Sequence, residues 1–266
     1  MLQNIIDQKI KEVEHRKSLY PIALLESSLH FTAPIVSLKE YILRPDKSGI
    51  IAEFKRKSPS KGLINPYANV ERTTIGYMQA GASALSILTD EHFFAASNAD
   101  LIEARKCNYC PILRKDFIID PYQIVEARSI GADCILLIAA VLNQSELKAF
   151  TAQAHDLGME VLVEIHADSE LDGALECEAD LIGVNNRNLK TMEVDPDYSF
   201  KMAEKIPTEK VKIAESGIQN PRDVIQLREA GYQGFLIGEL FMRNSRPEKA
   251  CQNFIEQLKL SKSECL

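Results

Sequence analysis

Short apolar runs recur along the chain and alternate with longer amphipathic segments, and this alternation most constrains the fold. The eight runs are IIAEF (50–54), ALSIL (84–88), PILRK (111–115), CILLI (134–138), VLVEI (161–165), LIGVN (181–185), VKIAE (211–215) and GFLIG (234–238). Their apolar character is continuous rather than alternating, which is typical of strands buried on both faces. The pattern therefore predicts a parallel sheet whose strands are connected and covered by helices.

The segments between the runs have the residue pattern of amphipathic helices. They cover residues 70–80, 99–107, 122–130, 144–157, 169–178, 197–205 and 221–230, and a last one covers 247–260. Gly81, Gly131, Gly158 and Gly231 end four of them just before the next run. Glycine readily takes the left-handed conformation that closes a helix, so these positions predict helix C-caps.

Eight such strand–helix units predict the α/β class and a (β/α)8 TIM barrel. The alternative is a doubly wound open sheet, which usually carries a glycine-rich nucleotide fingerprint after its first strand. The sequence SPSKG at 58–62 matches neither that fingerprint nor a Walker loop. Helical patterns at 2–18, 21–29 and 37–43 precede the first strand. We interpret residues 1–47 as an N-terminal helical extension and 48–266 as the barrel, within one domain.

Composition and charge exclude several classes of function. The net charge of −7 argues against non-specific nucleic-acid binding. No apolar run reaches the roughly 18 residues that a membrane-spanning helix requires. The amphipathic, acid-containing N-terminal segment does not resemble a targeting peptide. We therefore expect a cytoplasmic protein without nucleic-acid or membrane partners.

The cysteines and histidines give no metal site. Cys107 and Cys110 have C-x-x-C spacing, but no second pair follows and Cys110 leads into a predicted strand. Reduced structural thiols are the preferred interpretation, and a zinc or redox role is the alternative. The histidines are scattered, without the spacing of metal ligands.

Polar residues follow the predicted strands at their carboxyl ends, where barrels of this kind carry their reactive groups. Glu53 and Lys55 end the first strand, Lys115 the third, Glu164 the fifth, Asn185 and Arg187 the sixth, Glu215 and Ser216 the seventh, and Gly238 and Glu239 the eighth. The carboxylates of Glu53, Glu164 and Glu215 and the cations of Lys55, Lys115 and Arg187 would thus meet at one opening. A nearly balanced set of this kind suits a site that moves protons and binds an anion.

Two loop features add to this prediction. Ser216-Gly217 and Gly238 offer backbone N–H groups after strands seven and eight, where such barrels often hold a phosphate, although a Ser-Gly pair alone is usually a turn. Phe94 and Phe117 follow strands two and three, where they could enclose an aromatic substrate or simply pack the loops. We interpret His166 as a structural or surface histidine, because it is offset from the strand face of Glu164.

Seven motifs carry a resemblance to a known family. They are IIAEFKRKSPSKG, SILTDEHFF, PILRKDFIID, VLVEIH, GVNNRNL, IAESGI and FLIGELFMR. In this order they resemble indole-3-glycerol phosphate synthase of tryptophan biosynthesis, in its monofunctional form. The resemblance implies a carboxy-lyase that converts 1-(2-carboxyphenylamino)-1-deoxyribulose 5-phosphate to indole-3-glycerol phosphate, CO2 and water. It implies no cofactor and no metal.

The resemblance also implies roles for individual residues. Lys115 matches the general acid of ring closure, with a pKa that neighbouring cations would lower, and Glu164 matches the general base of later steps. Lys55, paired with Glu53, matches the group that contacts the substrate carboxylate and assists dehydration. The other matches are Asn185 and Arg187 for substrate orientation, Glu215 for substrate binding, Ser216, Gly217, Gly238 and Glu239 for the phosphate, Ser58 in the first loop, and Phe94, Phe117 and Leu136 around the ring.

Other functions stay open at this point. Another phosphate-binding barrel is possible, such as a sugar-phosphate isomerase or an aldolase that uses Lys115 or Lys55 as a Schiff-base nucleophile. A barrel that only binds phosphorylated ligands is the non-enzymatic alternative. We expect a monomer with a small phosphorylated substrate and transient contacts with other enzymes of the tryptophan pathway.

Overall fold

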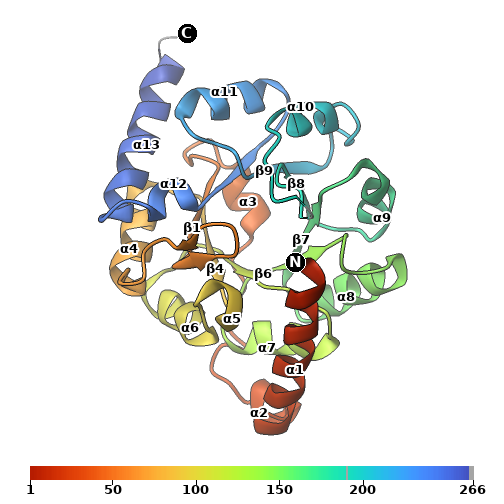
Figure 1. Cartoon of the computed structure of the whole chain (residues 1–266). Coiled ribbons are helices and arrows are strands. Elements are labelled where there is room, and N and C mark those ends of the chain that lie inside the picture. Colours follow the sequence, from red (N-terminus) through yellow and green to blue (C-terminus); the bar gives the residue numbers. More distant parts are fainter. Residues whose placement is uncertain (190, 264–266) are drawn as a thin grey trace.

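The computed structural model describes residues 1–189 and 191–263, and its central element is a closed barrel of parallel strands (Figure 1). The barrel strands are β1 (Ile50–Phe54), β4 (Ala84–Leu88), β5 (Ile112–Lys115), β6 (Cys134–Ile138), β7 (Glu160–Ile165), β8 (Leu181–Asn185), β9 (Val211–Glu215) and β10 (Gly234–Ile237). Each barrel strand pairs with the barrel strands before and after it in the sequence. The first strand, β1, also pairs with the last, β10, which closes the ring. The predicted (β/α)8 TIM barrel is confirmed.

The predicted strands agree with the structure to within one residue at each end. Pro111 lies just outside β5, and proline has no N–H to donate to a sheet. Gly238 falls outside β10 because the backbone there leaves the extended conformation and begins a short helix.

Helices surround the barrel and connect its strands (Figure 1). They are α4 (Val70–Ala80), α6 (Asn98–Cys107), α7 (Pro121–Ser129), α8 (Gln144–Asp156), α9 (Leu171–Glu176), α10 (Asp197–Ala203), α11 (Pro221–Glu229) and α13 (Pro247–Ser263). The four predicted capping glycines all have positive φ angles, between 78° and 98°. The segment predicted at 169–178 is instead a 3-10 turn, η1 (Asp168–Glu170), followed by the shorter helix α9.

The side chains of β1 alternate between two apolar layers. Ile50, Ala52 and Phe54 point outward into the layer between strands and helices. Ile51 packs inside the barrel, and Glu53 shares its face because side chains two residues apart on a strand point the same way. The same strand therefore supplies both core packing and a carboxylate at the barrel opening.

Three helices precede the barrel: α1 (Leu2–Leu19), α2 (Ile22–Glu26) and α3 (Leu38–Leu43). Leu38 and Ile42 of α3 are buried against residues that begin several strands, so α3 closes the amino end of the barrel. Helix α1 begins near the opposite, carboxyl end of the barrel (Figure 1). The N-terminal helical extension is thus present, and the division at residues 47 and 48 within one domain stays a prediction.

Several short elements were not predicted. They are α5 (Glu91–Phe94), α12 (Glu239–Met242) and the two-stranded hairpin of β2 (Lys57–Ser58) and β3 (Gly62–Leu63). All lie in loops that follow the carboxyl ends of barrel strands. Elements of two to four residues are too short to give a periodic sequence pattern. No helix among residues 1–189 and 191–263 is long and apolar enough to cross a membrane.

A buried lysine attaches α1 to the barrel. Lys9 is 1% exposed, and its Nζ lies 2.8 Å from Asp116 Oδ1 and 3.0 Å from Asp90 Oδ2. Asp116 directly follows β5, and Asp90 caps α5 through the backbone N–H of Phe93. Burial alone would lower the pKa of Lys9, but the surrounding carboxylates raise it above its usual value. Lys9 therefore stays charged and joins the extension to two segments at the barrel opening.

Replacing this lysine tests how much the contact stabilises the fold. We expect Lys9→Ala to lower the free energy of unfolding by about 3–5 kcal/mol, because two buried carboxylates would lose their cation. Lys11→Ala is the matched control, since Lys11 lies on the same helix and is exposed. Urea denaturation followed by circular dichroism measures both variants. Equal stability of the two variants would contradict a structural role for the buried cluster.

Candidate active site

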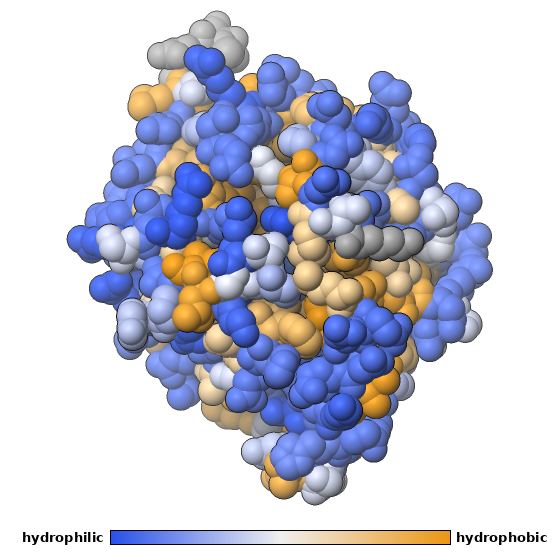
Figure 2. All heavy atoms as spheres, in the orientation of Figure 1, coloured by the Kyte–Doolittle hydropathy of each residue, from blue (hydrophilic) through white to orange (hydrophobic). Residues whose placement is uncertain are grey.

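The carboxyl ends of the strands surround a cavity of about 550 Å³. All fifteen residues proposed for the site line it: Glu53, Lys55, Ser58, Phe94, Lys115, Phe117, Leu136, Glu164, Asn185, Arg187, Glu215, Ser216, Gly217, Gly238 and Glu239. Figure 2 views this face of the molecule, where hydrophilic side chains dominate and apolar ones are also exposed near the centre. The structure thus brings the predicted residues together, while their chemical roles stay predictions.

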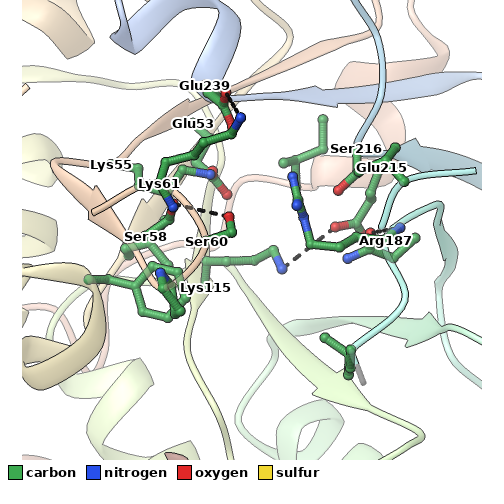
Figure 3. Close-up of a pocket in the computed structure, with 18 of the residues that line it drawn as sticks. Glu53, Lys55, Ser58, Ser60, Lys61, Lys115, Arg187, Glu215, Ser216 and Glu239 are labelled. Carbon is green, nitrogen blue, oxygen red and sulfur yellow. Dashed lines mark hydrogen bonds and ion pairs between the residues drawn. The ribbon is translucent and has the colours of Figure 1, made fainter. Parts of the chain in front are cut away.

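Strand β1 supplies the first ion pair of the site. The Lys55 ammonium contacts the Glu53 carboxylate, and both side chains point into the cavity (Figure 3). Glu53 lies against β10, where a Cβ atom on Gly238 would overlap its carboxylate. Glycine at this position therefore makes room for the buried carboxylate of the neighbouring strand.

Lys115, at the end of β5, lies close to Glu164 of β7 and Glu215 of β9, and Figure 3 shows Lys115 and Glu215 in the cavity. Its Nζ is 2.8 Å from Glu164 Oε2 and 3.6 Å from Glu215 Oε2. Burial alone would lower the pKa of Lys115, but the charges of Glu164, Glu215 and Glu53 outweigh it and raise that pKa. The expectation of a lowered pKa is wrong, because the charges nearest to Lys115 are negative.

Glu164 and Glu215 have opposite protonation preferences although they are neighbours. Burial would raise the pKa of Glu164, yet Lys115 and His166 hold it well below its usual value. Burial and the negative charge of Glu164 raise the pKa of Glu215 well above its usual value. The surroundings therefore favour the charged form of Glu164 and the protonated form of Glu215. Such a separation suits a site that needs both a base and a proton donor.

Gly183 of β8 makes room for the second of these carboxyl groups. A Cβ atom at this position would overlap Oε1 of Glu215, on the adjacent strand β9. Residue 183 is not itself a lining residue of the cavity among those described. Its effect on the site is therefore indirect, through the position of Glu215.

The loop after β8 folds back on itself beside the cavity. Asn185 Oδ1 accepts a hydrogen bond of 2.9 Å from the backbone N–H of Arg187. The Arg187 guanidinium donates to the carbonyl oxygen of Met192 at 3.1 Å, and Arg187 also pairs with Val194 through the backbone. These bonds hold both the backbone and the guanidinium of Arg187 at the cavity wall (Figure 3).

Two backbone segments are suited to bind an anion. Ser216 and Gly217 follow β9 with φ angles of 65° and 86°. Gly238 precedes α12, and both segments line the same cavity. In (β/α)8 barrels, the loops after strands seven and eight and the start of a short extra helix commonly hold a phosphate.

Apolar side chains line another wall of the cavity. The rings of Phe94 and Phe117 have centroids 6.2 Å apart, and Leu136 of β6 also lines the space. Met1, Leu2 and Ile5 of the N-terminal segment contribute as well. Sequence reasoning missed these three, because a helical pattern shows which residues are apolar but not which element they contact.

His166 differs from the surface location offered as one interpretation. Its side chain is only 6% exposed, and Nε2 lies 3.1 Å from Glu164 Oε1. His166 lies in the turn just after β7 ends at Ile165. The alternation of side chains along an ideal strand therefore does not predict the direction of its side chain. His166 is therefore a buried neighbour of the site.

The described cysteines and metal-ligand side chains form no further site. Cys107 and Cys110 are both unpaired thiols, and Cys110 is buried. Within residues 1–189 and 191–263, no group of three or more potential metal ligands occurs.

Comparison with known sequences identifies the family. The family model for indole-3-glycerol phosphate synthase matches residues 2–254. The chain belongs to the indole-3-glycerol phosphate synthase family. An indole-3-glycerol phosphate synthase of Bacteroides thetaiotaomicron is 46% identical over 97% of this chain and 98% of its own length. Another, from Laribacter hongkongensis, is 43% identical over 94% of this chain and 97% of its own. Enzymes of this family are carboxy-lyases of tryptophan biosynthesis.

Solved structures agree with the barrel fold of this family. A thiamine phosphate pyrophosphorylase from Pyrococcus furiosus superposes with a TM-score of 0.60 at 15% identity, covering 84% of this chain and 99% of its own. A chain of the tryptophan synthase a2b2 complex from Pyrococcus furiosus gives 0.58 at 16% identity, over 80% and 98%. At such identities the similarity supports the fold alone.

The fit between Gly183 and Glu215 can be tested directly. We expect Gly183→Ala to lower turnover by about tenfold or more, because a Cβ atom would displace a carboxyl group in the site. Gly173→Ala is the matched control, since the nearest atom to a Cβ there is Leu147 Cδ1 at 3.8 Å. Steady-state kinetics of both variants provide the comparison. Wild-type turnover in Gly183→Ala would mean that the position of Glu215 is unimportant.

Proposed function

We propose that this chain catalyses ring closure of 1-(2-carboxyphenylamino)-1-deoxyribulose 5-phosphate, followed by decarboxylation and dehydration to indole-3-glycerol phosphate. One observation carries the proposal. A buried lysine contacts two carboxyl groups whose pKa values are shifted in opposite directions, in a single cavity that also has backbone segments suited to bind an anion. Membership of the family supports the same reaction.

The substrate has three groups that the cavity can receive separately. Its phosphate fits the backbone N–H groups near Ser216, Gly217 and Gly238, with the backbone of Glu239 beside them. Its aromatic ring fits the apolar wall formed by Phe94, Phe117 and Leu136. Its carboxylate fits Lys55, and Ser58 in the same loop lies within the cavity wall.

Ring closure requires an acid at the ketone oxygen. The ring carbon that bears the carboxylate attacks the ketone carbon, and the electron pair of the C=O bond moves to oxygen. Lys115 polarises this oxygen and gives it a proton as a hydroxyl group forms. The raised pKa of Lys115 is compatible with this step, because an alkoxide is a still stronger base than an amine.

The later steps require a base and a second acid. Loss of CO2 leaves its electron pair in the ring, and departure of the new hydroxyl as water requires one more proton. Lys55, held by Glu53, is placed to supply that proton. Glu164 removes a proton from the intermediate to complete the indole, and its lowered pKa keeps it available as a base. Asn185, Arg187 and Glu215 orient the substrate through its polar groups.

The charge of Lys115 argues against the Schiff-base alternative. An aldolase of that type needs a neutral amine as nucleophile, whereas the carboxylates around Lys115 raise its pKa. Borohydride trapping with a keto substrate would detect such an intermediate. A monomeric state, transient contacts with other pathway enzymes and a cytoplasmic location stay predictions.

Direct observation of product tests the proposed reaction. Mixing the pure protein with the carboxyphenylamino-deoxyribulose phosphate should produce indole fluorescence as indole-3-glycerol phosphate forms. Binding of the substrate without a fluorescence change would favour a barrel that only binds phosphorylated ligands.

Removal of the acid or the base should abolish most turnover. We expect Lys115→Ala and Glu164→Gln each to lower turnover by at least roughly a hundredfold, the scale of a lost acid or base, while circular dichroism shows a folded barrel. Lys148→Ala is a suitable control, because Lys148 is an exposed lysine that pairs with Glu176 on the surface. A folded variant of Lys115 or Glu164 with wild-type turnover would refute the assigned roles.

The anion-binding segment can be tested through the Michaelis constant. We expect Gly217→Ala to raise KM about fivefold or more, because alanine disfavours the left-handed conformation by roughly 1–2 kcal/mol and the N–H groups would shift. A Cβ there would also lie 3.0 Å from Val194 Cγ1. Steady-state kinetics measure KM, with Gly173→Ala as the control. An unchanged KM would place the phosphate elsewhere.

A further inference from the structure

The carboxylate of Glu164 has a different neighbour at each oxygen. Lys115 Nζ lies 2.8 Å from Oε2, and His166 Nε2 lies 3.1 Å from Oε1. Lys115 lines the cavity, whereas His166 is not among the described lining residues. The histidine therefore approaches Glu164 from outside the substrate space.

The turn after β7 sets the position of His166. Its backbone N–H donates to Glu170 Oε2 at 2.7 Å, and the backbone N–H of Ala167 donates to the same atom at 3.3 Å. These bonds connect the end of β7 to the 3-10 turn η1 and hold the imidazole beside Glu164. The ring is thus placed by the backbone rather than by its own contacts.

The burial of His166 is costly without a polar role. Its Nδ1 and Nε2 atoms are both buried, and neither makes a hydrogen bond with good geometry to residues 1–189 and 191–263, so the 3.1 Å approach of Nε2 to Glu164 Oε1 is an ion-pair contact. An unsatisfied buried polar atom costs roughly 1–3 kcal/mol, so an apolar side chain would serve better if packing were its only purpose. The contact with Glu164 is the feature that an apolar residue could not reproduce.

The proposed reaction makes this contact more important during turnover. Lys115 has to turn from Glu164 toward the ketone oxygen of the substrate, which would leave Oε2 without its cation. The other ionisable group beside Glu164 is Glu215 of β9, and Glu53 of β1 acts on Lys115 and Glu215 while its carboxylate pairs with Lys55. Asp168 and Glu170 of η1 are the acidic groups on the side of His166. Among these groups, only His166 places a nitrogen at ion-pair distance from Glu164 without also lining the cavity.

We propose that His166 is a positioning residue that holds Oε1 of Glu164 while Lys115 acts on the substrate, so that Oε2 stays directed into the cavity. The inference rests on the proposed role of Glu164 as general base. A donor to a carboxylate favours its charged form, and the contact with His166 contributes to the lowered pKa of Glu164. Without that donor, Glu164 would take up a proton at a higher pH.

Two substitutions of similar size separate positioning from packing. His166→Leu keeps the buried volume without the donor, and His166→Gln keeps an N–H donor near the position of Nε2. We expect His166→Leu to lower kcat about tenfold with little change in KM, the scale of a lost polar contact to a charged group. We also expect the acid limb of its kcat–pH profile to move to higher pH. His166→Gln should restore most of kcat and the wild-type limb.

The outcomes that overturn the inference are distinct from those that overturn the reaction. The positioning role would be overturned if His166→Leu had wild-type kcat and an unshifted acid limb. It would also be overturned if His166→Leu and His166→Gln lowered kcat equally. If His166→Leu does not fold, His166→Asn replaces it in the experiment. The shorter amide of asparagine cannot reach Oε1, so its kcat must be lower than that of His166→Gln. Full turnover in Glu164→Gln would instead overturn the proposed role of Glu164.

Discussion

The contact between Lys115 and the carboxylates of Glu164 and Glu215 is the interaction on which the site depends. The three groups come from β5, β7 and β9, so only the closed barrel brings them within ion-pair distance. Burial of isolated charges would be strongly unfavourable, and the barrel reduces that cost by alternating positive and negative groups at one opening. The opposite pKa shifts of the two glutamates follow from this arrangement.

The N-terminal extension is part of the same electrostatic system. Lys9 of α1 contacts Asp116, the residue that directly follows Lys115, and also Asp90 at the start of α5. The extension therefore fixes the segment that carries the proposed acid and the helix that carries Phe94, in addition to covering the cavity with Met1, Leu2 and Ile5. Helix α3, with Leu38 and Ile42, closes the other end of the barrel. The extension thus acts at both ends of the strands.

The fold and the residues that form the site could be predicted from the sequence, because both follow from local patterns. Buried parallel strands give continuous apolar runs, and polar residues at their carboxyl ends must meet when the sheet closes. The direction of the pKa shift of Lys115 could not be predicted, because it depends on the distances to Glu164 and Glu215, which lie far from Lys115 in the sequence. The burial of His166 and the contribution of Met1 depend likewise on how a turn and a helix pack, which no residue pattern specifies.

Gly183 and Gly238 have a consequence for anyone who wishes to redesign this enzyme. Gly183 on β8 and Gly238 just after β10 each lie beside a carboxyl group of the site, Glu215 and Glu53 respectively, which fills the volume that a side chain would otherwise take. Glycine is thus required at both positions. Libraries that diversify the barrel opening to change substrate preference should leave them unvaried and place new bulk on the apolar wall near Leu136, where no carboxyl group has to be accommodated.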